Sequence, residues 1–574
     1  MVYQPLEYKA GKLGDKIKET LADWQSADKV QRLWASDSKL WTGQDEANWT
    51  GWLTIPQAET SQIPRIEALA AHLKTSGFTD VVLLGMGGSS LCPAMMATTF
   101  GKIAGFPKLH VLDSTAPEQI RRLEQSINLE KAFFIVSSKS GGTLEPNIFK
   151  AYFFARLQEV LNKKDVGDRF LAITDPNTAL ESLAKQDKFN AIFHGMPSIG
   201  GRYSALSNFG MVPSGLMGVN IAAFLGKASE MAVACASSPN VADNPGAMLG
   251  VIFGVCVNNG KDKVTLVVSP AVHAIGAWLE QLLAESTGKI GKGIIPVDLE
   301  PLGAPTVYGD DRVFVYIRFK DQPDAQQDTL IADLEKAGQV VVRIQVDSKE
   351  ALAGEMFRWE FATATAGSII QINPFNQPDV EASKVRAKEL TTEYEKTGKI
   401  SSFGSLVETD GLSLFTDDGN AQDLKKRLVG QASVENYLRA HFSRLVPGDY
   451  VDFAAFIEMS DEHFQALQQS RVLVRDHKKV ATCLGFGPRF LHSTGQAYKG
   501  GPNTGVFLQI TADHPNDIPV PGHQYTFGLV IQAQALSDFE VLVKRSRRAL
   551  RVHLGSDVKA GLAKLQAVIQ RALA

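Results

Sequence analysis

The sequence has 574 residues, a hydrophobic fraction of 44%, a charged fraction of 21% and a formal net charge of −3. These values are ordinary for a globular protein, and the weakly negative charge speaks against nucleic acid as a partner. No uninterrupted apolar run reaches the roughly 20 residues of a membrane span, and the first residues lack the apolar core of a signal peptide. The four scattered cysteines fit reduced thiols, so we expect a cytoplasmic protein without a membrane partner.

Residues 1–50 have an amphipathic helical pattern with tryptophans at spacings that suit packing, including Trp24 and Trp34. We expect a helical arm laid on the main body; an arm that binds a partner is the alternative.

Strands and helices alternate over residues 51–255. Short apolar runs predict five strands, at Val81–Leu84, Leu109–Leu112, Phe133–Val136, Phe170–Ile173 and Ala191–Phe193. Each run ends in a small or polar cluster. This rhythm predicts an open parallel sheet with helices on both faces, in which ligands bind beyond the carboxyl ends of the strands.

The most informative cluster is Ser137-Ser-Lys-Ser-Gly-Gly-Thr143, which follows a buried strand. Glu145-Pro146 then opens a helix, with Pro at a first-turn position. Hydroxyls, backbone N–H groups freed by glycine, the Lys139 ammonium and a helix N-terminus therefore converge. Such a collection suits a phosphate group, so we predict a binding loop for a small phosphorylated metabolite.

A second glycine-rich turn, Gly85-Met-Gly-Gly-Ser-Ser90, follows the first strand. It superficially resembles a dinucleotide fingerprint, but Ser90 stands where the third glycine would be. Nicotinamide binding is therefore the less favoured interpretation, and a turn that serves only packing is a further alternative.

A second α/β unit is predicted over residues 256–397, with a helix at Ser269–Glu285. Glu285 lies in the last turn, where the helix dipole disfavours a carboxylate by about 0.3–1 kcal/mol. It is either a surface residue or a base whose charge serves proton transfer. Arg202, in Gly200-Gly-Arg-Tyr-Ser204, is either a solvated charge or a fixed cation that steadies an anionic intermediate.

Residues 398–420 are rich in Gly, Ser, Thr and Asp and are predicted to be a linker. Beyond it, residues 421–574 predict a smaller α/β domain with a final helix from Asp557. His492 lies there in a glycine-rich stretch between two strands, where it is either a turn residue or part of a site.

Five of these motifs together resemble one family. Gly85–Ser90 and Ser137–Thr143 are similar to the sugar-phosphate-binding (SIS) signatures of phosphoglucose isomerase, and Gly200–Ser204 is similar to its Gly-Gly-Arg-Phe/Tyr-Ser signature. Ala284–Lys289 resembles its Glu-Ser-Asn-Gly-Lys motif, and Asn373–Glu381 resembles the bacterial Asn-Pro-Phe-Asp-Gln-Pro-Gly-Val-Glu motif. The remainder resembles the isomerase half of bacterial transaldolase/phosphoglucose isomerase fusions. The chain is then either that half excised or a stand-alone relative, and no transaldolase activity is expected from it.

The resemblance implies two SIS-type doubly wound parallel-sheet subdomains, a smaller C-terminal α/β domain, and interconversion of glucose 6-phosphate and fructose 6-phosphate in glycolysis and gluconeogenesis. It implies no metal and no cofactor, a sugar phosphate as the only small-molecule partner, and a homodimer. On matched positions it implies phosphate contacts from Gly88, Ser89, Ser138, Ser140 and Thr143 with Lys139 beside them, stabilisation of an enediolate by Arg202, proton transfer by Glu285, and a lysine near the ring oxygen at Lys384.

One departure from the family pattern concerns the ring-opening histidine, which in the family follows the catalytic glutamate by roughly thirty residues. Here that neighbourhood, Ala304–Arg312, contains no histidine. Either His492 replaces it, which we favour, or Lys384 and a water open the ring. An isomerase for another phosphosugar and a non-catalytic SIS binding module are the alternative functions.

Overall fold

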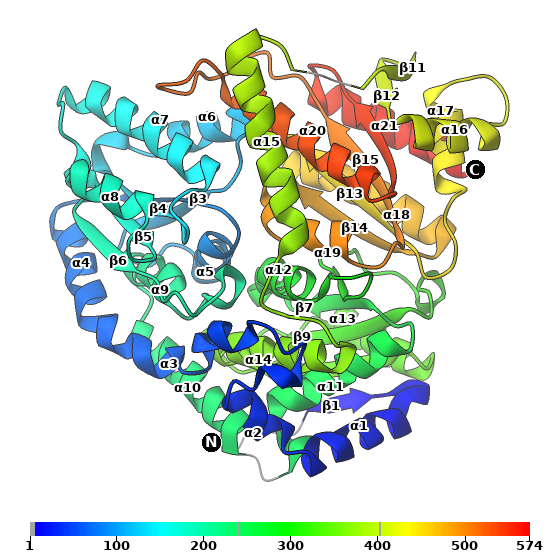
Figure 1. Ribbon diagram of the computed structural model, residues 1–574, viewed down its shortest axis with the longest axis horizontal. Helices are drawn as coiled ribbons and strands as arrows, with labels where there is room; N and C mark the ends of the chain where they lie inside the picture. The colour runs from blue at the N-terminus through cyan, green and yellow to red at the C-terminus, as the bar shows by residue number, and fades with distance from the viewer. Residues whose placement is uncertain (1–5, 238–239, 401–402) are drawn as a thin grey trace.

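The computed structural model describes residues 6–237, 240–400 and 403–574, so residues 1–5 of the predicted arm and 401–402 of the predicted linker lie outside it. The described residues form three sheets, each with helices on its faces (Figure 1). We name the parts around them the first, second and third unit. No helix within the described ranges is long and apolar enough to cross a bilayer.

The first unit contains the predicted open sheet, with strand order β3-β2-β4-β5-β6 and every neighbouring pair parallel. Its strands are β2 (Asp80–Gly85), β3 (Lys108–Leu112), β4 (Ala132–Ser137), β5 (Phe170–Thr174) and β6 (Ala191–His194). Phe133 and Ile135 face α4 (Ile63–Thr75) and α9 (Asn208–Leu216), whereas Phe134 and Val136 face α7 (Leu144–Leu161). Because both faces of the central strands β2, β4 and β5 are buried, these strands consist mainly of apolar runs, as the sequence predicted.

The second unit has strand order β1-β10-β9-β7-β8. Its parallel strands are β7 (Lys263–Val268), β8 (Ile295–Val297), β9 (Arg312–Phe319) and β10 (Val340–Val346). The helices of this unit are α10 (Ile221–Ser237), α11 (Pro245–Asn258), α12 (Ile275–Thr287), α13 (Ala325–Lys336) and α14 (Leu352–Ile370). The arm was expected to be helical, but β1 (Glu7–Lys9) adds an antiparallel edge strand to β10 before α1 (Gly14–Ser26) packs on α11.

The third unit is a six-stranded sheet of order β11-β12-β16-β15-β13-β14. Its parallel part consists of β13 (Tyr450–Phe456), β14 (Ala481–Phe486), β15 (Gly505–Thr511) and β16 (Arg548–His553). The helices are α15 (Pro378–Thr397), α16 (Asp418–Arg427), α17 (Val434–Phe442), α18 (Asp461–Lys478), α19 (Gly495–Gly500), α20 (Phe527–Lys544) and α21 (Val558–Leu573).

The range predicted to be a linker, 398–420, contains a hairpin instead. Strands β11 (Ser405–Thr409) and β12 (Leu412–Phe415) pair with each other, and β12 pairs with β16. Asp410 and Gly411 both have positive φ, which is the backbone of a tight hairpin turn. The polar composition that suggested a linker is therefore the composition of that turn and of an exposed edge strand.

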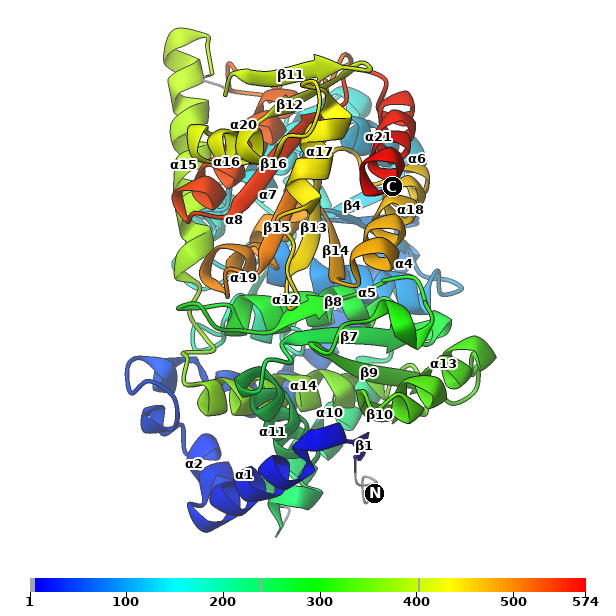
Figure 2. The ribbon, with the colours of Figure 1, turned by 90° about the vertical axis from the view of Figure 1, so that its right-hand side faces the viewer.

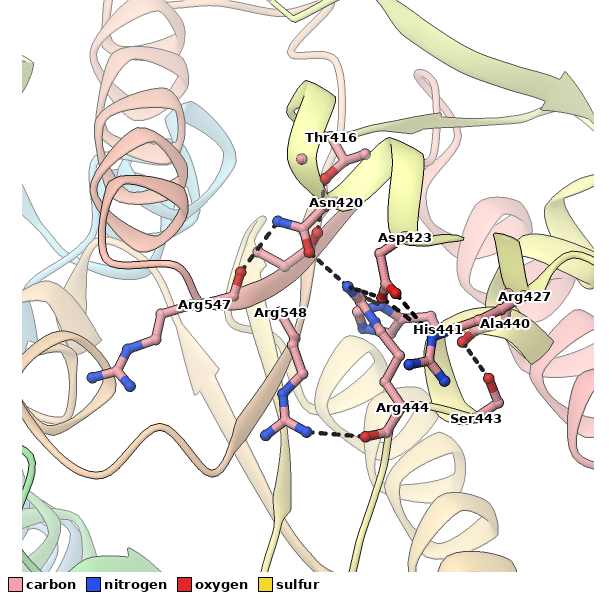
Figure 3. A network of polar contacts seen from close by, with 12 residues as sticks. Thr416, Asn420, Asp423, Arg427, Ala440, His441, Ser443, Arg444, Arg547 and Arg548 are labelled. Atoms are coloured by element: carbon pink, nitrogen blue, oxygen red, sulfur yellow. Dashed lines mark hydrogen bonds and ion pairs between the residues drawn. The ribbon is translucent and has the colours of Figure 1, made fainter. Parts of the chain in front are cut away.

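A polar network attaches α16 and α17 to the sheet of the third unit (Figure 3). Arg444 donates to the Asn420 side chain at 2.6 Å, and Asn420 donates to the Arg547 carbonyl at 3.2 Å. Arg548 on β16 donates to the Arg444 carbonyl at 3.0 Å and forms a bidentate pair with Asp449. Since most of these groups are partnered within the unit, we interpret the network as structural.

The three units meet where the loops after their strands converge. Phe527 of α20 stacks on Phe149 of α7, with ring centroids 6.0 Å apart, so the third unit packs directly on the first. Helix α12 of the second unit contacts both α5 (Leu91–Phe100) and α19, and α15 runs alongside α20 (Figures 1 and 2). This junction is the place where residues from all three units approach one another.

A buried ion pair in the third unit gives a stability test. Lys499 on α19 and Asp538 on α20 are 2.6 Å apart and at most 1% exposed. Lys499→Met removes the cation and leaves the buried Asp538 carboxylate with only the 3.1 Å hydrogen bond from Gln509, so we expect a loss of about 3–5 kcal/mol in the free energy of unfolding. Urea unfolding followed by circular dichroism measures it. Lys559→Met is the matched control, because its pair with Glu462 is exposed and its loss should leave the midpoint nearly unchanged.

Candidate functional site

The predicted phosphate-binding loop connects β4 to α7. Gly141 has φ +68°, and a Cβ there would lie 2.8 Å from the Thr178 side chain, so the turn requires glycine. Ser138 is buried and donates to the Thr143 hydroxyl at 3.3 Å, while Ser140 is exposed. Thr143 occupies the N-cap of α7 without capping it through its side chain. The first N–H groups of α7 are therefore free of a side-chain cap, in the arrangement that binds anions.

Lys139 lies in this loop, but its ammonium forms an ion pair with Asp175 at the end of β5. A phosphate in the loop would therefore meet a lysine whose charge is already compensated. The structure brings Lys139 to the predicted place and gives it a partner that the sequence did not indicate.

The turn after β2 lies against the Arg202 loop. Gly87–Ser89 form a single 3-10 turn, and Ser89 is buried. A Cβ on Gly88 would lie only 2.0 Å from the carbonyl oxygen of Gly201. Absence of a side chain at Gly88 thus allows two loops of the first unit to touch, which places Ser89 close to the Arg202 segment.

Arg202 is buried and its guanidinium is held on all sides. It donates to Ser286 Oγ at 2.7 Å, to Gln377 Oε1 at 2.9 Å, and to the carbonyls of Pro374 and Asn376 at 2.8 and 2.9 Å. The Asn373–Glu381 motif and the Ala284–Lys289 motif thus share one role in this structure, which is to fix the position of this cation.

Glu285 lies beside Arg202. Its Oε1 is 3.6 Å from Arg202 Nη1, and its Oε2 accepts a hydrogen bond of 3.0 Å from Gln281, one turn earlier on α12. Lys289, which the sequence analysis did not single out as a functional residue, donates to the Glu285 carbonyl at 3.0 Å. Burial holds the pKa of Lys289 well below its usual range, and the neighbouring Arg202 lowers it further.

His492 reaches this junction from the third unit. Its Nε2 lies 3.0 Å from Oε1 of Glu145, in the first turn of α7, and Gln534 of α20 donates to the same oxygen at 2.7 Å. The His492 carbonyl accepts a hydrogen bond of 2.8 Å from Gln281, the residue that also contacts Glu285. One glutamine side chain therefore joins the histidine loop to the predicted base.

Glu145 is a buried carboxylate with a defined charge state. Burial alone raises its pKa, but the nearby charge and hydrogen bond of His492 outweigh that effect and leave the pKa below its usual range, with a smaller contribution from Lys384. An ionised Glu145 accepts the Nε2 proton of His492, which leaves Nδ1 as the nitrogen available to a ligand.

Lys384 lies on α15 and is the least fixed of the predicted residues. Its side chain is 38% exposed, and its one ion pair within the described ranges is a 3.6 Å contact with Glu381. It is near enough to Glu145 to affect the pKa of that carboxyl group. The structure therefore brings Lys384 to the edge of the site rather than into its hydrogen-bonded centre.

Three functional candidates were missed by the sequence analysis: Glu145, Gln281 and Gln534. Glu145 carried a signal, because an acidic residue opens the helix that follows the phosphate loop. Gln281 lies one turn before Glu285 on the same helix face. Gln534 carried no signal, because only the packing of the third unit on the first brings it to Glu145.

The described residues contain no group of three or more His, Cys, Asp or Glu side chains that could hold a metal ion. What the arrangement offers is acid–base chemistry: an anion-binding loop, a carboxylate beside a fixed guanidinium, and a histidine held by a second carboxylate.

The contact between the two glycine loops gives a test of the geometry. Gly88→Ala drives a methyl group into the Gly201 carbonyl, so we expect a loss of about 1–3 kcal/mol in stability, as for overpacking in a core. Thermal unfolding of the purified chain measures it. Gly142→Ala is the control, since a Cβ there meets no atom within 4 Å; equal transition temperatures for the two variants would contradict the tight contact.

Comparisons with known proteins indicate which family the sequence resembles. A model of the family described as phosphoglucose isomerase matches residues 70–310. A glucose-6-phosphate isomerase of Parabacteroides distasonis is 28% identical over 397 residues, which cover 60% of this chain and 88% of that relative. One of Trichormus variabilis is 32% identical over 253 residues, covering 41% of this chain and 46% of that relative, so the similar region spans about half of its length.

Among solved structures, a hypothetical protein of Thermus thermophilus matches with a TM-score of 0.57 at 22% identity, covering 67% of this chain and 99% of that protein. That likeness shows a shared fold. The matched range 70–310 contains the phosphate loop, Arg202 and Glu285. Over this range, the chain is similar to the phosphoglucose isomerase family.

Proposed function

We propose that the chain interconverts glucose 6-phosphate and fructose 6-phosphate through a cis-enediolate, with Glu285 as the base. The observation that carries the proposal is the placement of the Glu285 carboxylate 3.6 Å from a guanidinium that four hydrogen bonds hold in place. A base next to a fixed cation suits removal of a proton next to a carbonyl, because the charge that develops on oxygen needs a cation that does not move.

Each step has a group to perform it. The loop 137–143 and Ser89 bind the phosphate, which fixes the distance from the phosphate to the reacting carbons. His492, held through Nε2 by Glu145, uses Nδ1 to exchange a proton with the ring oxygen and so opens the ring. Glu285 then takes the proton from the carbon next to the carbonyl and returns it to the neighbouring carbon. Arg202 stabilises the negative oxygen of the enediolate between the two transfers.

Support for a hexose 6-phosphate comes from the glucose-6-phosphate isomerases that resemble this chain. The homodimer expected from the family resemblance stays a prediction, as does the cytoplasmic location.

A coupled assay tests the proposal. Fructose 6-phosphate offered to the purified chain should yield glucose 6-phosphate, and Glu285→Gln should keep substrate binding yet lose turnover by at least about 10²-fold. Glu159→Gln is the control, since Glu159 is an exposed acid near the end of α7. Binding without conversion by the unaltered chain would indicate a non-catalytic binding module, and preferred conversion of glucosamine 6-phosphate or mannose 6-phosphate would change the substrate.

The role of His492 has a separate test. His492→Gln should reduce turnover of fructose 6-phosphate by about 10²-fold or more, because general acid–base catalysis of ring opening is lost. Erythrose 4-phosphate has no ring to open, since its fourth oxygen carries the phosphate. Exchange of its carbon-bound hydrogen with deuterium from solvent should therefore survive in His492→Gln and disappear in Glu285→Gln. Equal loss of exchange in both variants would assign His492 to the proton transfer between carbons instead.

A further inference from the structure

A cavity of about 500 Å³ lies at the carboxyl edge of the sheet in the third unit. The ends of three parallel strands contribute to its wall, through Phe456 of β13, Thr511 of β15 and His553 of β16. Helix α20 contributes Ile531 and Gln532. None of the residues of the candidate site lines this cavity, and its volume is within the usual range for sites of small ligands.

The topology of the sheet places the cavity at a switch point. β13 lies between β14 and β15. The chain passes from β13 to β14 on one side and then crosses to β15 on the other side of β13. Phe453 and Ala455 of β13 face the core shared with α18, whereas Ala454 and Phe456 face the core shared with α20. In open α/β sheets, the crevice at such a point, beyond the carboxyl ends of the strands, is the usual ligand site.

Arg551 supplies a cation to the cavity, with the carboxylates of Asp538 and Glu540 near enough to raise its pKa but in no ion pair with it. Its Nε donates to Gln509 at 2.7 Å and its Nη2 to the Ala535 carbonyl at 3.1 Å, and its guanidinium lies 4.9 Å from the Phe539 ring centroid. No carboxylate within the described ranges forms an ion pair with it, and its Nη1 has no hydrogen-bond partner there. Burial lowers its pKa to about 10, so it remains charged at neutral pH. A guanidinium in this state favours an anion in the cavity, and phosphate matches its geometry.

The acids that line the cavity do not compensate Arg551. Asp513 pairs with His553 at 3.2 Å, and Asp517 accepts the backbone N–H groups of Ile518 and Gly528 at 2.7 Å each. Both carboxylates therefore interact with groups other than Arg551, and Nη1 of Arg551 is available to a ligand.

Four Phe and Tyr side chains also line the cavity. Tyr394 from α15, Phe403, Phe415 from β12 and Phe456 from β13 come from four separate segments and line the same space. Flat aromatic side chains of this kind stack on planar rings, and a stacked base contributes about 1–3 kcal/mol. A ligand that contacts both the aromatic side chains and Arg551 needs a planar ring and an anionic group.

We propose that this cavity is a second ligand site, separate from the isomerase site, and that it binds a mononucleotide. The base lies among the aromatic side chains, and the phosphate contacts Arg551. The assignment does not depend on the isomerase activity, because no residue proposed for that reaction takes part.

Calorimetric titration of the full chain tests the assignment with three probes: adenosine monophosphate, adenosine and inorganic phosphate. The monophosphate should bind with a Kd below about 1 mM. Adenosine and inorganic phosphate should each bind at least about tenfold more weakly. Adenosine lacks the phosphate that contacts Arg551, and inorganic phosphate lacks the base that stacks on the aromatic side chains. Absence of measurable binding of the monophosphate, or equal affinity for adenosine, would overturn the proposal.

Two variants locate the binding. Arg551→Gln should weaken the monophosphate at least about tenfold, and Gln532→Trp should abolish binding by filling the cavity from an exposed position on α20. Arg318→Gln is the matched control, since that arginine pairs with Asp328 in the second unit. Should Arg551→Gln fail to fold, Gln532→Trp still decides the question. Binding that survives Gln532→Trp, or that saturating fructose 6-phosphate displaces, would place the nucleotide elsewhere and overturn the proposal.

Discussion

The contact between Glu145 and His492 is the constraint on which the site depends. The two residues are 347 positions apart and belong to the first and third units, yet their side chains meet at 3.0 Å in a buried place. A buried carboxylate is costly without partners, and here it has two, His492 and Gln534, both from the third unit. Docking of the third unit therefore satisfies the charge of Glu145, and Glu145 in turn fixes the orientation of the proposed acid–base group.

Arg202 is likewise a charged group that partners from distant segments hold in place. A mobile arginine would lose part of its effect on an anionic intermediate, because it would have to reorient as the charge develops. Four hydrogen bonds that Arg202 donates, one to Ser286 on α12 and three to the segment 374–377 between α14 and α15, remove that freedom. The motifs Ala284–Lys289 and Asn373–Glu381 are thus explained by what they do for one side chain, which motif matching alone did not indicate.

Much of the fold could be predicted because it depends on local pattern. The run at Phe133–Val136 is apolar throughout, as a strand buried on both faces requires, and Val340–Val346 is apolar except at Arg343 and Gln345. The phosphate loop, Arg202 and Glu285 could be proposed from the sequence for a similar reason, since each motif is contiguous. The β11–β12 hairpin was missed because its turn and its exposed edge have the composition of a linker. Gln534 could not be predicted, because its role exists only where two distant segments pack together.

The segment that departs from the family pattern, and lacks a histidine, contacts the third unit. Residues 298–312 form a platform on which the third unit rests: Arg471 of α18 donates to the Asp298 carbonyl at 3.1 Å, and Thr482 of β14 donates to Glu300 at 2.8 and 3.0 Å. Glu300 also pairs with Arg312 at 3.1 Å. The loop that carries His492 follows directly from β14. The region where the family places its ring-opening histidine therefore anchors the strand whose following loop carries His492 to Glu145. If His492 has the proposed role, the replacement of one histidine by another depends on how two units dock, and loss of this docking would remove His492 from the site.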